Sequence, residues 1–453
     1  MTAKPANYIP AVREQYEEFP YPDRKPEEEK VRLLSGYLMR LDAVSHHCYR
    51  GAQNFQDFRV LIAGGGTGDA VVAWAEQLRG LGKSEVVYLD MSTTSMQIAK
   101  KRADVRRLDN IKWINDSLLN IPDLNLGQFD FIDCTGVLHH LKEPDLGLKT
   151  LKGALKPGGA MNLMVYAPYG RTGIYHMQNL MRLINEDEDS ATRKIINTKA
   201  ALASLPPNHL LRIMGSHGIE FNDMKNDAGI YDMFLHAQDR PYNIMEVHDW
   251  LERCGLEMVS EPGVSNLQTH YEPETFIKDE KLLRYIADYP LKIRQGIGEA
   301  LSTKITMHEF YCTHAGGEDR TARVTDTHLV PWGGVDPKAS FDQIATVAEQ
   351  NKKDVTITFN HRSDKPSMGI PYGKFIPDLL RLIDGKRSIA EIYAALKAIP
   401  GFKDYKGVDA DIAAEFARLF TLLNRAHNLY LREKSVEPFT SLVELSARVA
   451  KIK

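Results

Sequence analysis

Short apolar runs alternate with longer amphipathic stretches through the first third of the chain. Val60–Ala63 and Val86–Leu89 are two such runs, and Ala70–Arg79 lies between them with helical periodicity. A short apolar run predicts a buried strand, and a strand–helix–strand order predicts a parallel sheet. The pattern recurs, so we expect a doubly wound α/β sheet with further strands at Ile111–Asp116, Gln128–Gly136, Ala160–Tyr166 and Leu256–Ser260.

The first two predicted strands end in residues that suit a ligand. Gly64, Gly66 and Gly68 follow the first strand, and glycine permits a sharp turn and a close approach of the backbone to a ligand. Asp90 ends the second strand, 22 positions after Gly68. An acid at this place accepts hydrogen bonds from a ribose diol in nucleotide-binding βαβ units. The pattern therefore predicts a nucleoside-cofactor site.

The residue after the last glycine distinguishes between cofactors. A dinucleotide fingerprint requires a small third residue so that the helix packs closely on the strand. Counted from Gly64, that place is the charged Asp69. The loop instead suits a cofactor without pyrophosphate, whose zwitterionic amino-acid end lies beside it. A tight strand–helix turn without a ligand is the alternative at this point.

The order of these motifs, followed by the Leu155–Gly159 turn, resembles the class I S-adenosylmethionine-dependent methyltransferases over residues 55–170. The resemblance implies a seven-stranded Rossmann-like sheet and S-adenosylmethionine as the cofactor. It places Gly64, Gly66 and Gly68 under the methionine part, Asp90 on the ribose hydroxyls and Asp116 on the adenine amino group. It also implies that Cys134–Val137 line the methyl-transfer mouth. The other cofactor-binding residues that we expect are Asp69, Met91, Ser117 and Thr135.

One position departs from the family pattern. Methyltransferases of this class often have an acid two residues before the first glycine, and this chain has Ile62 there. Asp69 or backbone carbonyls are therefore the candidates for holding the ammonium group of the cofactor.

The pattern predicts four parts. Residues 1–54 form an N-terminal strap and helix, in which Tyr16 and Tyr21 lie among prolines and are expected to line the site. Residues 55–265 form the methyltransferase domain, with an insertion at 171–235 that is expected to cover the acceptor pocket. Residues 266–320 form a helical connector, with helices at Asp279–Leu301 and Thr303–Tyr311, and residues 321–453 form a winged-helix-like accessory domain.

Several side chains near the predicted mouth suit acceptor chemistry. His236 and Asp239 lie just before a helix that Asn243 and Glu246 begin as a capping box. His139 follows the fourth strand, and Tyr21 lies in the strap. We take His139, His236, Asp239 and Tyr21 as candidate catalytic residues, although surface or structural roles explain the same residues. His139 and His140 lack a third ligand at a suitable spacing, so no metal site is predicted.

The C-terminal pattern resembles a small winged-helix module. It predicts a strand at Val355–Phe359, helices at Leu379–Gly385, Ser388–Leu396 and Ala413–Asn424, and a short strand at Asn428–Arg432. Winged helices often bind DNA. The last predicted helix, however, contains one arginine and one glutamate, which neutralise phosphates poorly. We therefore expect a protein contact or a homodimer here, with no nucleic-acid partner.

Composition agrees with a globular protein of two or three domains. The chain has 453 residues, of which 43% are hydrophobic and 26% charged, and its net charge is −3. Its four cysteines are scattered without pairing motifs, as in a reduced, cytoplasmic protein. Neither a signal peptide nor a membrane span is predicted.

We therefore expect an enzyme that moves a methyl group to a nucleophilic nitrogen or oxygen atom, with a protein side chain as the leading acceptor. The strap and the domain layout loosely resemble the bacterial protein-lysine methyltransferases with regulatory regions. A small-molecule acceptor is the first alternative. A non-catalytic scaffold or regulatory protein that binds the cofactor is the second.

Overall fold

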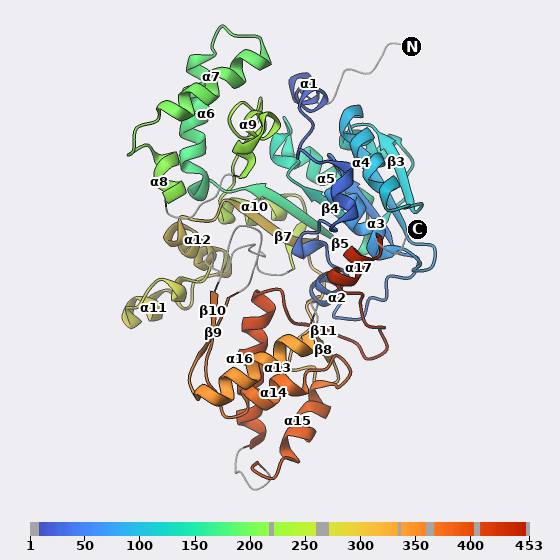
Figure 1. Ribbon diagram of the computed structural model, residues 1–453, viewed down its shortest axis with the longest axis vertical. Coiled ribbons are helices and arrows are strands. Elements are labelled where there is room, and N and C mark those ends of the chain that lie inside the picture. Colours follow the sequence, from blue (N-terminus) through green and yellow to red (C-terminus); the bar gives the residue numbers. More distant parts are fainter. Residues whose placement is uncertain are drawn as a thin grey trace.

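The computed structural model of the protein describes residues 9–216, 222–259, 271–333, 337–358, 367–402 and 408–449. Its centre is a seven-stranded sheet in the order β3-β2-β1-β4-β5-β7-β6 (Figure 1). Neighbouring strands among β1 to β5 are parallel, whereas β7 runs antiparallel to both β5 and β6. The predicted doubly wound, Rossmann-like methyltransferase sheet is confirmed.

The sheet is formed by β1 (Arg59–Ala63), β2 (Glu85–Asp90), β3 (Ile111–Asn115), β4 (Phe129–Thr135), β5 (Leu155–Tyr166), β6 (Leu256–Met258) and β7 (Met307–His314). The helices of this part are α1 (Pro10–Glu18), α2 (Leu41–Cys48), α3 (Asp69–Leu78), α4 (Thr93–Val105), α5 (Pro144–Ala154), α6 (Thr172–Ile184), α7 (Ala191–Ser204), α8 (Leu210–Ser216), α9 (Asp227–Phe234), α10 (Ile244–Arg253), α11 (Glu280–Ile286) and α12 (Leu291–Ser302).

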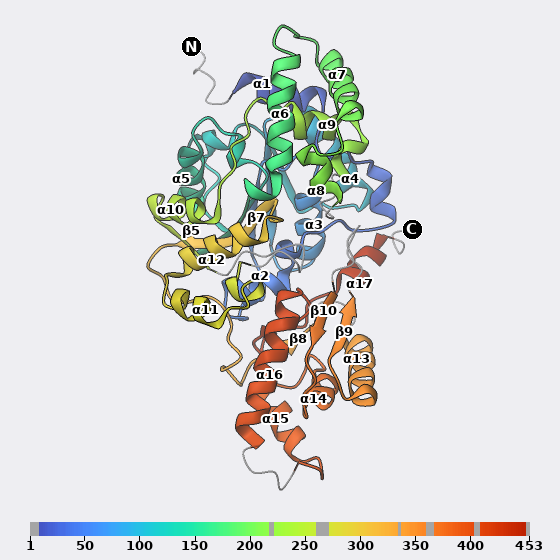
Figure 2. The same cartoon turned by 90° about the vertical axis from the view of Figure 1, so that its left-hand side faces the viewer.

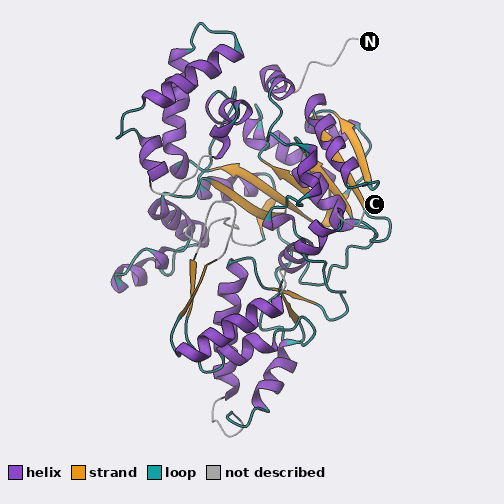
Figure 3. Cartoon of the chain, in the orientation of Figure 1, coloured by secondary structure: helices purple, strands orange, loops and turns teal. Residues whose placement is uncertain are grey.

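Both faces of the sheet are covered by helices, as Figure 2 and Figure 3 show. Alternate residues of a strand point to opposite faces, so Leu61 and Ala63 pack in one core together with residues of α5 and α10. Val60 and Ile62 pack in a second core together with residues of α2 and α3. This two-sided burial explains why the strands are continuous apolar runs.

The seventh strand differs from the sequence expectation. We predicted a helix over Thr303–Tyr311, but β7 occupies Met307–His314 and lies between β5 and β6. The helix prediction was therefore wrong. Phe310, Tyr311 and Cys312 are all buried, because a strand inserted between two others has cores on both faces, and local periodicity does not distinguish such a strand from a buried helix.

The sheet therefore continues beyond the expected end of the domain. The boundary predicted at 265 falls outside the described residues, and β7 belongs to the segment that we predicted as a helical connector. The return strand predicted at Leu256–Ser260 is present as β6, Leu256–Met258, at the edge of the sheet.

A helical lobe of α6 to α9 stands over one end of the sheet (Figure 1). Its own small core is formed by nine buried residues: Ile174, Met177, Met181, Ile195, Leu205, Leu211, Ile230, Met233 and Phe234. The lobe lies on the side where the parallel strands β1 to β4 end. The predicted insertion is therefore helical and placed near the carboxyl edge, where α/β sheets bind ligands.

The C-terminal part contains α13 (Pro337–Asn351), α14 (Ile376–Leu382), α15 (Ile389–Lys397), α16 (Val408–Arg425) and α17 (Leu442–Ala447). Two short ribbons accompany them, β9 (Val355–Thr358) with β10 (Ser367–Ile370), and β8 (Val330–Trp332) with β11 (Tyr430–Arg432). The predicted helices and strands are present, except that Phe359 lies outside the described residues. The winged-helix assignment stays a prediction.

The chain end returns to the first half of the molecule. Arg448 donates a hydrogen bond to the carbonyl of Glu76 in α3, and the Ser446 hydroxyl accepts one from the Leu33 backbone. In Figure 1 α17 accordingly lies beside α3. Among the described residues, no helix combines the length and apolar character that crossing a membrane requires.

Candidate active site

The glycine loop joins β1 to α3 in a backbone conformation that favours glycine. Gly64, Gly66 and Gly68 have φ angles of 80°, 48° and 105°, which side chains disfavour. The turn brings the Gly66 N–H to 2.8 Å from Asp90 Oδ2. The predicted loop and the predicted ribose acid are therefore neighbours.

The loop is also closely packed. A β-carbon on Gly64 would lie 2.4 Å from Val137 Cγ2, and one on Gly68 would lie 2.8 Å from Ala99 Cβ. Val137 belongs to the segment after β4 that we predicted to line the mouth, and Ala99 lies on α4. The absence of side chains thus lets the loop fit between these two elements.

Asp90 is held by backbone donors on both oxygens. Its Oδ1 accepts the Ser92 N–H at 2.8 Å, and its Oδ2 accepts the Gly66 N–H. Burial raises the pKa of Asp90, and these N–H groups oppose that rise. Met91, between Asp90 and the α4 N-cap Ser92, is half-buried.

The third and fourth strands end in further predicted residues. Asp116 Oδ1 accepts hydrogen bonds from the Ser117 N–H and from Asn120 Nδ2, both at 2.7 Å. The Ser117 hydroxyl caps the following turn. Thr135 donates to Asp133 Oδ1 at 2.8 Å. Asp116 and Thr135 therefore lie at the carboxyl ends of strands on the two sides of β1.

The N-terminal strap crosses this edge of the sheet. The Glu17 carboxylate accepts the backbone N–H groups of Thr93 and Thr94 at 2.8 and 2.9 Å, at the start of α4. A β-carbon on Gly66 would lie 2.9 Å from the carbonyl oxygen of Tyr21. The strap backbone, at the carbonyl of Tyr21, therefore packs directly on the glycine loop.

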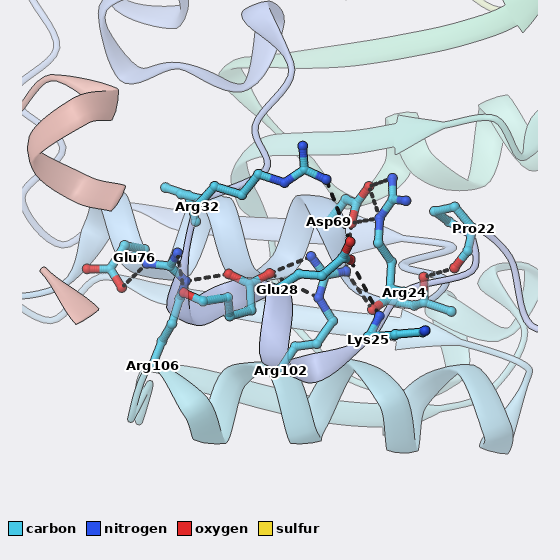
Figure 4. Close-up of polar contacts among 12 residues, drawn as sticks. Pro22, Arg24, Lys25, Glu28, Arg32, Asp69, Glu76, Arg102 and Arg106 are labelled. Atoms are coloured by element: carbon cyan, nitrogen blue, oxygen red, sulfur yellow. Dashed lines mark hydrogen bonds and ion pairs between the residues drawn. The ribbon is translucent and has the colours of Figure 1, made fainter. Parts of the chain in front are cut away.

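Asp69 takes part in an ion network (Figure 4). Arg24 lies 2.8 Å from Asp69 Oδ2 and Arg102 lies 2.6 Å from Asp69 Oδ1. Arg102 also pairs with Glu29, which Arg106 contacts from the other side. Burial alone would raise the pKa of Asp69, but the hydrogen bonds from Arg24 and the charge of Arg102 hold it below its ordinary value.

A cluster of histidines and acids lies at the ends of β4 and β5, beneath the lobe. His139 and His140 form the turn after β4, whereas His236 and Asp239 follow α9. The rings of His140 and His236 stack, with centroids 3.8 Å apart and planes inclined by 19°. Tyr16 of the strap donates to Asp232 Oδ1 at 3.0 Å and lies 3.2 Å from His236 Nε2. The fold therefore joins strap, sheet and lobe at this cluster.

A buried guanidinium borders the cluster. Arg171 lies 3.8 Å from Asp239 Oδ2, and the exposed fractions of the two side chains are 7% and 1%. The guanidinium carbon also lies 3.5 Å from the centroid of the Tyr166 ring at the end of β5. Gln178 of α6 donates to Asp239 Oδ2 at 3.1 Å. The sequence left open whether Asp239 is a surface residue. In the structure its carboxylate is buried and contacts Gln178 of the lobe and Arg171, which precedes the lobe.

The structure corrects the argument that no third metal ligand accompanies the histidines. His139, His140 and Asp239 bring ligand atoms within 4.8 Å of one another, as do His140, Asp232 and His236. Neither acid lies near His140 in the sequence.

The structure brings together three of the four predicted catalytic residues, His139, His236 and Asp239, and places the backbone carbonyl of Tyr21, the fourth, over the glycine loop. The predicted cofactor-binding residues lie along one edge of the sheet. Sequence reasoning missed Asp232 and Arg171 as members of the cluster, and of the adjacent pair His139 and His140 it took only His139 as a candidate. No spacing in the sequence indicates Asp232 or Arg171, because they come from elements separate from the histidine turn.

The family comparison matches this geometry. Residues 61–161 match a family model described as a methyltransferase domain. The fold and this match define the class of the protein: it contains a class I S-adenosylmethionine-dependent methyltransferase domain, with S-adenosylmethionine as the cofactor.

Particular relatives extend the comparison. An uncharacterized protein of Synechococcus sp. is 29% identical over 314 residues, which are 68% of this chain and 72% of the relative. The tRNA 5-carboxymethoxyuridine methyltransferase of Escherichia coli (strain K12) is 33% identical over 116 residues, 25% of this chain and 42% of that protein. The latter match therefore covers less than half of the relative.

A solved structure matches most of the fold. PKMT2 from Rickettsia typhi, in complex with AdoHcy, aligns with a TM-score of 0.59 at 14% identity and covers 89% of this chain and 76% of that protein. At this identity the likeness concerns the fold. Because the alignment covers 89% of this chain, the likeness extends well beyond the sheet.

Proposed function

We propose that this protein transfers a methyl group from S-adenosylmethionine to a nucleophilic nitrogen or oxygen atom of a protein side chain. The observation that carries the proposal is the His140–Asp239–Arg171 cluster, in which the turn after β4 meets residues that flank the lobe in the sequence. It lies next to the segment that the resemblance assigns to the methyl-transfer mouth. The fold likeness to PKMT2 over 89% of the chain supports a protein acceptor.

The residues at the carboxyl edge fit the cofactor. Asp90 would hold the ribose hydroxyls, because each carboxylate oxygen takes one backbone N–H and retains a second lone pair. Asp116 would hold the adenine amino group, and Gly64–Gly68 would pass under the methionine part. When bound, S-adenosylmethionine supplies a methyl group that its sulfonium charge has already activated.

The protein then has to orient the acceptor and exclude water. Holding two reactants in the right orientation can lower the activation barrier by about 7–11 kcal/mol. The strap closes one side of the site through Glu17, and Gln178 of the lobe closes another together with Arg171. Both Asp69 oxygens face arginines, so we assign the cofactor ammonium to backbone carbonyls of the loop region rather than to Asp69.

A small-molecule acceptor is the second candidate. His139 has no exposed surface, and the exposed fractions of His140 and His236 are 6% and 4%. Such burial favours an acceptor that is small, or a narrow side chain that enters from the surface. The two candidates share the same cofactor site.

Calorimetric titration of S-adenosylmethionine into the full chain tests the cofactor site. We expect saturable binding that weakens at least about tenfold in Asp90→Ala, a loss of about 1.4 kcal/mol. The exposed Asp187→Ala variant is the matched control. Absence of binding to the unsubstituted protein would refute the proposed function.

Transfer of radiolabelled methyl groups into fractionated cell extract then tests the acceptor class. A protein acceptor gives label that is retained on a filter and released by protease. A small acceptor gives label that passes the filter, and an RNA acceptor gives nuclease-sensitive label. Only the first result supports the protein-side-chain proposal.

A further inference from the structure

The stacked imidazoles of His140 and His236 are oriented by the backbone of one residue, Gln238. The carbonyl of Gln238 lies 2.6 Å from His140 Nδ1. The N–H of Gln238 donates to His236 Nδ1 at 3.0 Å. A carbonyl accepts and an N–H donates, so the two rings must be opposite tautomers when neutral.

The tautomers follow directly from these hydrogen bonds. His140 carries its proton on Nδ1, and its lone pair is on Nε2. His236 has its lone pair on Nδ1 and carries its proton on Nε2. Burial is the main cause that lowers the pKa of both histidines, so both rings are neutral near pH 7.

Tyr16 and Asp232 complete the environment of His236. The His236 Nε2–H points to the Tyr16 hydroxyl oxygen at 3.2 Å, and that hydroxyl donates to Asp232 Oδ1 at 3.0 Å. Every polar atom of the His236 ring is then engaged. The lone pair of His140 Nε2 is the one basic position that the stacked pair leaves open, and none of the described residues donates a hydrogen bond to it.

Charged and titratable groups face His140 from each element packed on it. Asp239 raises its pKa, and Arg171 lowers it. His139 and His236 contact its ring, with centroids 4.0 and 3.8 Å away, and the Tyr166 ring lies 6.2 Å away. Asp239 is therefore the group placed to stabilise a cationic His140.

We propose that His140 Nε2 is the proton acceptor of this methyltransferase, and that His236 and Tyr16 are positioning residues that hold the His140 ring by stacking and hydrogen bonding. The inference rests on the proposed function. In the step, the acceptor's N–H or O–H bond breaks and the proton forms a bond with His140 Nε2. The electron pair stays on the acceptor atom as the lone pair that would take the methyl group, while the carbon–sulfur bond of the cofactor would break and leave its electron pair on sulfur. Asp239 balances the new positive charge on His140.

A metal ion at the same residues is the competing interpretation. In the His140–Asp232–His236 group, the protonated Nε2 of His236 has no lone pair to offer a metal. In the His139–His140–Asp239 group, Arg171 already supplies a positive charge 3.8 Å from Asp239 and would repel a divalent cation. The hydrogen bonds thus favour proton transfer.

Nitrogen-15 NMR of the full chain with labelled histidine tests the tautomers without an identified acceptor. We expect His140 to show a protonated Nδ1 and His236 to show a protonated Nε2 at pH 7. His140→Gln and His236→Gln assign the resonances, and exposed His176→Gln is the control. Equal tautomer populations in either ring would overturn the proposal. So would tight, stoichiometric Zn²⁺ retention after dialysis, measured by elemental analysis.

Kinetics tests the role of His140. The probe is transfer of radiolabelled methyl groups from S-adenosylmethionine to the cell-extract acceptor fraction as a function of pH. His140→Gln should reduce kcat by about 10²–10⁴-fold and abolish the fall in rate at low pH, with unchanged cofactor affinity by calorimetry. Tyr16→Phe should reduce kcat several-fold and shift that acid limb, leaving KM for S-adenosylmethionine unchanged.

The controls separate failure of this inference from failure of the proposed function. If His140→Gln binds the cofactor and transfers methyl groups at the unsubstituted rate and pH dependence, His140 is not the proton acceptor, although the enzyme is still a methyltransferase. If the unsubstituted protein does not bind the cofactor, the proposed function itself fails.

Discussion

Arg102 lies 2.6 Å from Asp69, the residue that follows the glycine loop. The same guanidinium donates to the carbonyl of Thr67 at 2.9 Å and pairs with Glu29 of the N-terminal strap region. Side chains of α4 and the strap thus hold the loop from outside the sheet. Both carboxylate oxygens of Asp69 take part in these ion pairs, which supports a structural role for Asp69.

The buried ion pairs of Glu29 in this network should contribute strongly to the stability of the protein. Glu29 has no exposed surface and pairs with Arg102 and Arg106. Glu29→Gln leaves two buried guanidiniums without a full counter-charge and should cost about 3–5 kcal/mol in the free energy of unfolding. Urea denaturation measures the loss. The neighbouring, more exposed Glu28→Gln is the control, and equal effects of the two variants would contradict the prediction.

Asp69 in this network should also affect how the free energy of unfolding depends on pH in the acid range. The pKa of folded Asp69 lies below its ordinary value. Its contribution is therefore present above the unfolded pKa of about 3.9 and is lost as pH falls through the folded pKa. Below about pH 4, the stability of Asp69→Asn should depend less steeply on pH than that of the unsubstituted protein. Chemical denaturation at several pH values measures the slope, and parallel curves would count against it.

Two glycines with the same φ angle allow the effect of side-chain packing at the glycine loop to be separated from the effect of backbone conformation. Gly64 and Gly80 both have φ of +80°, but a β-carbon on Gly64 would meet Val137 at 2.4 Å, whereas nothing lies within 4 Å of one on Gly80. Gly64→Ala should therefore destabilise the protein by about 1–3 kcal/mol more than Gly80→Ala, the cost of overpacking. Thermal denaturation provides the comparison, and similar losses would show that the contact relaxes freely.

The strap should dock through Glu17. Its carboxylate accepts two backbone N–H groups at the start of α4, where a negative charge is stabilised by about 0.3–1 kcal/mol. Glu17→Gln should increase amide hydrogen exchange in residues 10–24 and leave β1 to β5 unchanged. The exposed Glu18→Gln is the control. Unchanged exchange in the strap would show that Glu17 does not hold it.

Local patterning was sufficient for the parallel half of the sheet and for the edge at which we propose that the cofactor binds. Apolar runs such as Val86–Leu89 indicate strands buried on two faces, and the polar or glycine residue after each run lies at the same edge. Chain order alone therefore predicted that Gly66 and Asp90 are neighbours. It failed at β7, because the burial of Phe310 and Cys312 depends on insertion between β5 and β6.

The sequence by itself determined the class of fold and the residues on the strand ends, since these follow from spacing within one βαβ pattern after another. The cofactor followed from the resemblance of the ordered motifs to the class I methyltransferases. Only the tertiary structure decided the cluster that we propose to meet the acceptor. The fold brings together residues of the strap, the sheet and the lobe region: Tyr16, His140, Asp232 and Asp239. Spacing in the sequence does not predict contacts between these elements, because their packing depends on hydrophobic cores formed by residues far apart in the chain. The tautomers of His140 and His236 likewise depend on the Gln238 backbone, a contact that exists only once the lobe has folded onto the sheet.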